Sequence, residues 1–530
     1  MTTAGTRTPG PPPAARTPAA GDGPARPRWA AHRLGLAVPL LPAAAMTALG
    51  LWRLDARGPW RDEVATYQVA LRGWGRIGQL LHHVDAVHGL YYLLMHGVFL
   101  LFGASLAVLR LPSVAAMAVA AGGVAVIGRR LAGPAVGLTA GLLLAVTPFA
   151  SKYAQEGRSY ALVTAGVVIA TALLLRAWER PTPRRWAGYA AAVLLVGLLH
   201  LFALLVLAAH GAAVLTARGP AARRVRRGWA ASAASAALCA APLALFSATQ
   251  SAQVDWLPPV TGKTPLALLT DFAGPTGTVT AVVLVLAALG LALPVRRPGG
   301  PVALRALALP WLVVPPALLM TASLATPLYY DRYVLYSLPG LVLLAAAGLD
   351  TAARAAGRLA VGLSRSVRVP GPAAATAAVA LLGVGLAGGV LTLEAHRQRI
   401  ERTSRARVDD FRAAADALRL GARPGDGVVF VPAARRPVED VYPDAFRGTV
   451  DVLRSETPAA SGTLSGRQVP VRRIQGLLLG YARVWLLDGL GRHTAVQAPE
   501  QEVLRVLHTR YREAGRTAVR GFRVQLWVRR

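Results

Sequence analysis

The chain has 530 residues, a formal net charge of +32 and a mean hydropathy of +0.43. Hydrophobic residues make up 54% and charged residues 16%, whereas soluble domains carry roughly 25% charged residues. These values exclude a single water-soluble domain and, for most of the chain, intrinsic disorder. The apolar residues form many runs of about 20, which is typical of a polytopic membrane protein. We therefore interpret the basic residues as topology signals and expect no nucleic-acid partner.

Residues 1–28 are rich in Pro, Ala, Gly and Thr and show no periodicity, which predicts a disordered cytoplasmic tail. Arg26, Arg28 and Arg33 precede the first apolar run. This order indicates an uncleaved signal anchor whose N-terminus stays inside the cell.

Eleven membrane spans are predicted from apolar runs, since ~20 residues cross ~30 Å of hydrocarbon. The runs at 187–199 and 201–217 are shorter than this and form the weakest pair. Their ranges are 34–54, 111–128, 134–151, 160–177, 187–199, 201–217, 229–247, 276–294, 306–325, 334–349 and 373–393. Arginine clusters in the intervening loops all fall on one side, which the positive-inside rule makes cytoplasmic. The anionic lipid head groups of that leaflet are expected partners.

Residues 90–109 are apolar enough to span the membrane. An extra span there would place either the arginine clusters or the N-terminus on the wrong side of the membrane. We interpret them as a juxtamembrane or re-entrant element, and a twelve-span topology stays open.

A change of composition divides the chain near residue 394. Residues 29–393 form the predicted transmembrane domain, and residues 394–530 form a predicted soluble extracytoplasmic α/β domain. Strands are expected at 428–431, 484–488 and 522–528, and helices at 404–420 and 499–515. The fold class is thus an α-helical polytopic membrane protein with a C-terminal α/β domain.

Carboxylates gather on the predicted outer face. Of ten between residues 34 and 393, eight lie in outer loops and none in the middle of a span: Asp55, Asp62, Glu63, Asp85, Glu156, Asp255, Asp271 and Asp331. A proton-coupled transporter usually carries acids at mid-membrane depth. The outer position instead favours an enzyme that acts at the membrane surface.

Several outer residues have chemistry suited to a site. Asp62 and Glu63 are adjacent carboxylates, which suits a base beside a second acid. Lys152, Arg158 and Arg332 could clamp a phosphate, and Asp85, His88, Glu156, His200 and Asp331 are further substrate or metal candidates. The alternative for each is an ordinary solvated or interfacial side chain.

The order of motifs adds a resemblance. WRDE (60–63), DAVHGLYYLLMH (85–96), VLRLPS (108–113), TPFASKYAQEGRSYAL (147–162), LLHLFALLVLAAH (198–210) and YYDRYVLYSLP (329–339) follow one another. This series resembles the polytopic C-superfamily glycosyltransferases, chiefly family 39, the protein O-mannosyltransferases. It is also similar to the RgtA/B/C/D-like and lipid A aminoarabinose transferases. The resemblance covers about residues 34–393.

The resemblance implies transfer of a mannose-like hexose from a polyprenyl-phosphate donor to an extracytoplasmic protein, glycan or lipid acceptor, with inversion, at the plasma membrane. It implies Asp62 as catalytic base and Glu63 as its partner. Lys152, Arg158 and Arg332 would hold the donor phosphate. No organic cofactor is implied. If a divalent cation such as Mg²⁺ or Mn²⁺ takes part, Glu63 and Glu156 are its expected ligands.

Two other hypotheses remain open at this stage. A polyprenyl-lipid flippase or transporter would use the same spans without forming a bond. Alternatively, the C-terminal domain could be the functional part and the spans its anchor, or that domain could bind the acceptor.

Overall fold

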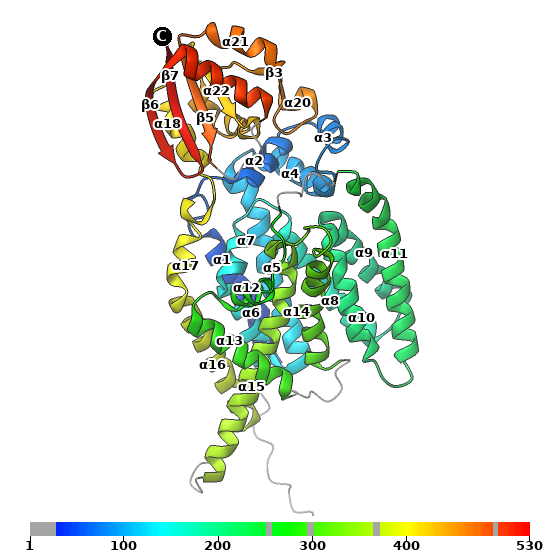
Figure 1. Cartoon of the computed structure of the whole chain (residues 1–530). Coiled ribbons are helices and arrows are strands. Elements are labelled where there is room, and N and C mark those ends of the chain that lie inside the picture. Colours follow the sequence, from blue (N-terminus) through cyan, green and yellow to red (C-terminus); the bar gives the residue numbers. More distant parts are fainter. Residues whose placement is uncertain (1–27, 251–256, 294–301, 364–370, 491–496) are drawn as a thin grey trace, which may run out of the picture.

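A computed structural model describes residues 28–250, 257–293, 302–363, 371–490 and 497–530. Residues 1–27 of the predicted tail and Asp255 lie outside the described residues. A large helical part carries a smaller sheet domain at one end, with the short helices α2 to α4 between them (Figure 1). We call this end the site face and the other end the opposite face.

Six described helical stretches are long and apolar enough to cross a membrane. They are α5 (Leu106–Ala132), α8 (Tyr160–Glu179), α11 (Ala222–Ala248), α14 (Leu304–Ala322), Asp331–Ala360, which comprises η4 (Asp331–Ser337) and much of α15 (Leu338–Leu363), and α16 (Pro372–Leu393). Two bent pairs raise this number to eight: α6 (Pro134–Val146) with α7 (Pro148–Ala154), and α12 (Thr264–Ala273) with α13 (Gly277–Ala292). The count of eleven spans stays a prediction.

Every predicted span nevertheless falls on helical structure. The remaining three coincide with α1 (Arg28–Leu51), α9 (Pro183–Leu199), and η2 (Leu201–Leu205) followed by α10 (Val206–Leu215). The pair α6–α7 is bent by 66° and the pair α12–α13 by 93°, so the predicted span 134–151 is broken into two helices. Pro148 begins α7, and its missing N–H explains the break.

Residues 90–109 do not form one helix. The chain forms α4 (Gly89–Phe102), turns at Gly103 with a positive φ of 78°, and starts α5 at Leu106. A helix of 14 residues is about 21 Å long, which is less than the thickness of the hydrocarbon layer. Just before α4 lie α2 (Arg61–Ala70), α3 (Trp74–Leu81) and η1 (Ala86–His88).

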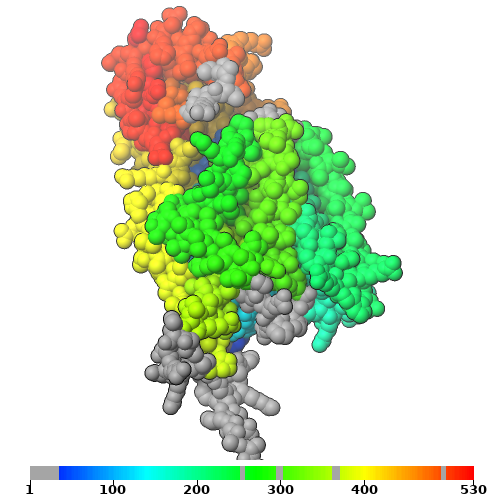
Figure 2. All heavy atoms as spheres, turned by 60° about the horizontal axis from the view of Figure 1, so that its bottom comes forward, coloured from blue at the N-terminus to red at the C-terminus, as the bar shows by residue number. Residues whose placement is uncertain are grey.

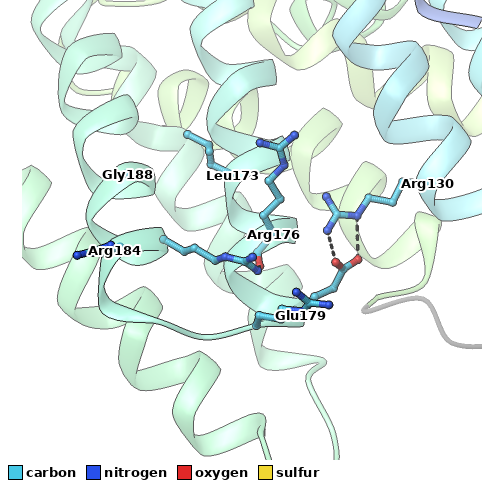
Figure 3. A pocket seen from close by; sticks show the side chains of 8 residues that line it. Arg130, Leu173, Arg176, Glu179, Arg184 and Gly188 are labelled. Atoms are coloured by element: carbon cyan, nitrogen blue, oxygen red, sulfur yellow. Dashed lines mark hydrogen bonds and ion pairs between the residues drawn. The ribbon is translucent and has the colours of Figure 1, made fainter. Parts of the chain in front are cut away.

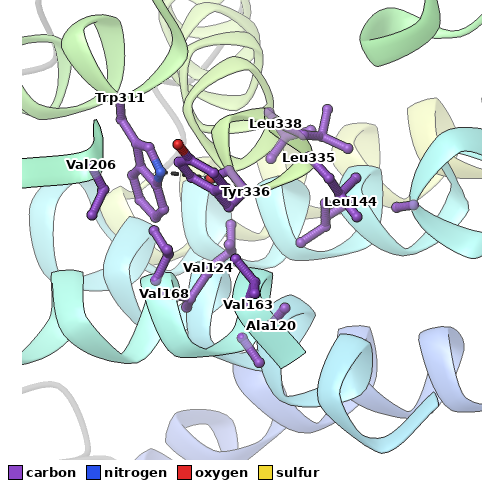
Figure 4. Close-up of a cluster of buried hydrophobic side chains, with 14 of the residues drawn as sticks. Ala120, Val124, Leu144, Val163, Val168, Val206, Trp311, Leu335, Tyr336 and Leu338 are labelled. Carbon is purple, nitrogen blue, oxygen red and sulfur yellow. Dashed lines mark hydrogen bonds between the residues drawn. The ribbon is translucent and has the colours of Figure 1, made fainter. Parts of the chain in front are cut away.

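Small residues allow the long helices to approach closely. A Cβ on Gly290 of α13 would lie 2.1 Å from the carbonyl oxygen of Leu344 in α15. Such contacts drive helix association in lipid, where no hydrophobic force acts between helices. Larger side chains fill the centre, where Trp311 of α14 donates a hydrogen bond of 2.7 Å to the carbonyl of Tyr336 (Figure 4).

The C-terminal domain has a five-stranded mixed sheet in the order β2-β1-β5-β7-β6. Its strands are β1 (Gly427–Val431), β2 (Val450–Asp451), β5 (Arg483–Gly489), β6 (Tyr511–Val519) and β7 (Phe522–Arg529), and β3 (Arg454–Glu456) pairs separately with β4 (Arg467–Gln468). Its helices are α17 (Ala395–Ile400), η5 (Ser404–Ala406), α18 (Phe411–Arg419), η6 (Ala433–Arg435), α19 (Val438–Val441), η7 (Pro443–Phe446), α20 (Pro458–Ser461), α21 (Val471–Leu479) and α22 (Ala498–Arg510).

The three predicted strands are confirmed, but two helix predictions need correction. Residues 404–420 form η5 and then α18, separated by a short extended segment. The helix expected at 499–515 ends at Arg510, because residues 511–519 pair antiparallel with β7 as an edge strand. Its alternation is weak since only Tyr511 is buried, so the sequence pattern did not reveal a strand.

The two parts are joined without a gap. The segment after α16, yellow in Figure 2, runs along the helical part into the sheet domain. Val64 of α2 is buried in the core formed by α18 and the sheet. The site face is thus covered by the C-terminal domain.

Candidate active site

Four separate segments meet on the site face beneath the sheet domain. They are the start of α2, the turn η1, the loop between α7 and α8, and the start of η4. Each brings one candidate residue: Asp62, His88, Arg158 and Arg332.

Asp62 is the partly exposed acid of this group, with 18% of its side chain accessible. It lies in the first turn of α2, and its Oδ2 is 3.5 Å from Nη2 of Arg332. Its Oδ1 is 3.9 Å from Nε of Arg61. A carboxylate in this position is accessible to solvent and close to a cation, which suits a base beside a phosphate site.

Arg332 is fixed by aromatic side chains. Its Nε donates to the hydroxyl of Tyr160 at 3.1 Å. Its guanidinium carbon lies 4.1 Å from the ring centre of Tyr330 and 5.0 Å from that of Trp60. Stacking and a planar fork suit arginine rather than lysine. The motif YYDRY (329–333) already places three tyrosines close to Arg332 in sequence. The approach of Trp60 and Tyr160 could not be predicted from the sequence.

Arg158 is buried and is already hydrogen-bonded to two neighbouring side chains. Nη2 lies 2.8 Å from Nε2 of His88, and Nη1 donates to Oγ1 of Thr66 at 3.1 Å. Burial and the charge of Arg158 hold the pKa of His88 well below its usual range. His88 is therefore neutral and accepts this hydrogen bond at Nε2, so the pair positions the loop around Asp62.

Asp85 forms a second contact near His88. Its Oδ2 accepts a hydrogen bond of 2.7 Å from Tyr92, and its own backbone is left-handed with φ 59°. Burial raises the pKa of Asp85. We interpret Asp85 as a group that shapes the turn η1.

His200 joins the aromatic side of the site. Its ring lies 5.1 Å from that of Tyr333 and 5.9 Å from that of Tyr160, centre to centre. Burial lowers the pKa of His200 to about 3, so the imidazole is neutral at physiological pH. Its Nε2 is buried and has no hydrogen-bond partner within the described part of the chain, which is compatible with a ligand contact.

Lys152 and Asp331 both lie close to Tyr153. Nζ of Lys152 is 4.0 Å from Oε2 of Glu401 in the segment that leads to the sheet domain. Oδ1 of Asp331 accepts from the backbone N–H of Arg332 at 2.6 Å and from Tyr153 at 3.5 Å. Asp331 thus orients the start of η4 that carries Arg332.

Glu63 occupies a different environment from its neighbour Asp62. Both oxygens are paired with Arg110, at 2.8 and 2.9 Å, and Oε1 also accepts from the N–H of Gly157 at 2.9 Å. Burial raises the pKa of Glu63, but Arg110, Arg57 and Arg407 outweigh it and lower the pKa to about 2. The structure therefore places Glu63 in a buried ion pair that holds loops together.

Glu156 is held in the same way by the C-terminal segment. Its Oε1 is 2.5 Å from Nη2 of Arg407, and both side chains are almost fully buried. Arg57 bridges the two parts by donating to the carbonyls of Gln155 and Glu401 at 2.8 and 2.6 Å. Arg110, Arg57 and Arg407 were missed from the sequence. The arginine inside the apolar stretch VLRLPS was the one available signal.

The expected ligands of a divalent cation do not fit that role. The oxygens of Glu63 are engaged with Arg110, and Glu156 shares Oε1 with Arg407. Among the described residues, no three His, Cys, Asp or Glu side chains converge on a point where a metal could bind.

Comparisons with known proteins agree with the resemblance seen in the motifs. The sequence model of the dolichyl-phosphate-mannose-protein mannosyltransferase family matches residues 89–247. No curated protein matches the chain.

Solved structures share the fold over most of the chain. ArnT from Cupriavidus metallidurans in the apo state has a TM-score of 0.58 at 15% identity, covering 94% of this chain and 98% of its own. ArnT bound to undecaprenyl phosphate has a TM-score of 0.54 at 14% identity and covers 92% and 97%. The Archaeoglobus fulgidus oligosaccharyltransferase, in complex with Zn and sulfate, has a TM-score of 0.51 at 12% identity and covers 85% and 68%. The chain thus has the fold of polytopic membrane glycosyltransferases.

Proposed function

We propose that this protein is a membrane glycosyltransferase that moves a sugar from a polyprenyl-phosphate donor to an acceptor hydroxyl at the site face. The observation that carries the proposal is the pairing of Asp62 with Arg332, 3.5 Å apart and partly open to solvent. A base and a phosphate ligand meet there at one end of the membrane helices. The ArnT structure with undecaprenyl phosphate, which shares this fold, supports a lipid-phosphate donor.

The reaction is a single displacement with inversion. Asp62 takes the proton of the acceptor hydroxyl while its oxygen forms a bond to the anomeric carbon. On the opposite side, the bond from that carbon to the phosphate oxygen breaks, and the lipid phosphate leaves with an added negative charge. Arg332 stabilises this charge, because its guanidinium is held in place by Tyr160 and Tyr330 before the reaction.

The other predicted residues take supporting roles in this scheme. Lys152 is the second candidate for the phosphate, since its ammonium is only loosely paired with Glu401. Arg158 is engaged with His88 and Thr66, so we assign it to positioning of α2 rather than to first contact with the donor. The sugar is a mannose-like hexose, and the outer face of the plasma membrane is the proposed place of reaction.

Replacement of the base tests the proposal. Full-length protein in liposomes is supplied with labelled polyprenyl-phosphate mannose and an extract containing envelope acceptors, and release of polyprenyl phosphate together with labelled product is measured. Asp62→Asn should lower the rate by roughly 10²–10⁴-fold, the usual contribution of a general base. Asp55→Asn is the matched control, because Asp55 lies in the loop that precedes α2, with 65% of its side chain exposed.

Full activity of Asp62→Asn would disprove the role of the base. Movement of the lipid across the bilayer without release of polyprenyl phosphate, in the unaltered protein, would instead support a flippase.

A further inference from the structure

A pocket of about 590 Å³ opens on the opposite face, away from the candidate active site. It lies where α5 and α8 end and α9 begins (Figure 3). Its lining residues are Arg130, Leu173, Arg176, Glu179, Arg180, Arg184, Arg185 and Gly188. The helix α8 separates the two sites, because it starts beside Arg158 and its 20 residues extend for about 30 Å.

The lining is strongly cationic. Five arginines and one glutamate give it a net charge of +4. Glu179 is neutralised by Arg130, whose Nη2 and Nε lie 2.5 and 2.8 Å from its two oxygens. Arg185 donates to the carbonyl of Arg176 at 2.9 Å and so caps the end of α8. Three arginines with exposed side chains, Arg176, Arg180 and Arg184, thus line a preformed hollow that suits an anion.

The surface beside the pocket is apolar and follows one face of α8. Ile169 is 45% exposed, and Leu173, Arg176 and Arg180 follow it at helical spacing on the same face. This stripe changes from apolar to cationic at the end of a membrane helix. On α9, Leu195 is 53% exposed two turns beyond Gly188. Acyl chains could therefore lie along the stripe while a head group enters the pocket.

We propose that this pocket binds the phosphate head group of an anionic phospholipid, and that a lipid with two phosphates fits it best. Arginine pairs with phosphate oxygens through two parallel hydrogen bonds, and three exposed arginines exceed what one phosphate needs. A soluble anion would not use the apolar stripe at Ile169 and Leu173. The inference does not depend on the proposed sugar transfer.

Native mass spectrometry of the full-length protein in detergent, titrated with diphosphatidylglycerol and with phosphatidylcholine, tests the site. The variant Arg176→Gln/Arg180→Gln/Arg184→Gln should bind diphosphatidylglycerol roughly tenfold or more weakly, since each arginine near a lipid surface contributes substantially. The matched control is Arg223→Gln/Arg224→Gln/Arg227→Gln. It removes the same charge from exposed positions near the start of α11, outside the pocket.

The single variant Arg184→Glu guards against misfolding of the triple variant and should also weaken binding. An equal loss in the pocket and control variants would show general charge attraction and overturn the proposal. Displacement of the lipid from the unaltered protein by millimolar inorganic phosphate would identify a soluble-anion site and overturn the assignment to a lipid. Equal binding of phosphatidylcholine would overturn it as well.

Discussion

Asp62 and Glu63 are adjacent carboxylates, but only Glu63 is fully buried, and this difference in burial separates their roles. Asp62 and Glu63 follow each other on α2, so their side chains point about 100° apart. Glu63 faces inward to Arg110, while Asp62 faces the open site. The residue pattern predicted the two acids as a pair, and only the family resemblance distinguished Asp62 as the base from Glu63 as its partner. The buried ion pair of Glu63 was not predicted, because it depends on the position of Arg110 in α5.

Replacement of Glu63 should lower the stability of the folded protein by an amount that depends on pH. Its pKa falls from an ordinary 4.5 to about 2 in the folded protein, which corresponds to roughly 3 kcal/mol of stabilisation. This stabilisation is present above pH 4.5 and is lost as pH falls towards 2. Glu63→Gln should therefore unfold at a lower temperature than the unaltered protein at pH 7. The difference should narrow below pH 4.5, as measured by thermal unfolding in detergent. A pH-independent difference would contradict this account.

Arg332 should not tolerate lysine. Its fork contacts Tyr160 and Asp62 together and stacks on Tyr330, and an ammonium cannot reproduce this planar geometry. We expect Arg332→Lys to lower sugar transfer by about 10²-fold, the size seen when one preorganised donor is lost, with little change in unfolding temperature. The activity assay for Asp62 measures it. Activity within twofold of the unaltered protein would refute the role.

The ends of the membrane helices were predictable from the sequence, whereas the docking of the sheet domain onto them was not. Loop residues far apart in sequence, such as His88 and Arg158, were expected to meet because every second helix end lies at the same membrane face. The contacts to the C-terminal domain depend on its tertiary position. Gln68 and Arg72 of α2 donate to the carbonyls of Leu464 and Thr463 at 2.7 and 2.8 Å.

This docking makes the C-terminal domain part of the site's support. Val64 is buried in its core, and deletion of residues 400–530 would expose Val64 and leave Glu156 without Arg407. Such a deletion cannot separate acceptor binding from collapse of the loop. Single replacements within the joining segment are the better experiment.

Arg407→Ala should weaken the contact between the helical part and the C-terminal domain. It leaves the buried Glu156 carboxylate without its ion-pair partner, and removal of one partner of a buried pair costs about 3–5 kcal/mol. We expect a lower unfolding temperature and faster proteolysis after residue 394. Arg405→Ala is the control, since Arg405 is exposed in the same segment. Equal behaviour of the two variants would show that the pair does not hold the domain.

For the whole molecule, the charge of +32 predicts orientation rather than chemistry. Arginine clusters at the ends of α5 and α8 and at the start of α11 lie on the opposite face. The positive-inside rule predicts that this face lies in the cytoplasm. We therefore expect the candidate site and the sheet domain to be extracytoplasmic, because Arg158 lies just before the start of α8 and Arg176 lies near its far end.

Cysteine labelling can test this orientation, because Cys239 is the chain's single cysteine. In a Cys239→Ala background, Arg447→Cys places a thiol on the sheet domain, where the Arg447 side chain is 83% exposed. Thr182→Cys places one in the exposed turn between α8 and α9. A membrane-impermeant maleimide should label Arg447→Cys in intact cells and Thr182→Cys only after permeabilisation. The reverse pattern would invert the topology and move the proposed reaction to the cytoplasmic side, where nucleotide-sugar donors would compete with lipid-linked ones.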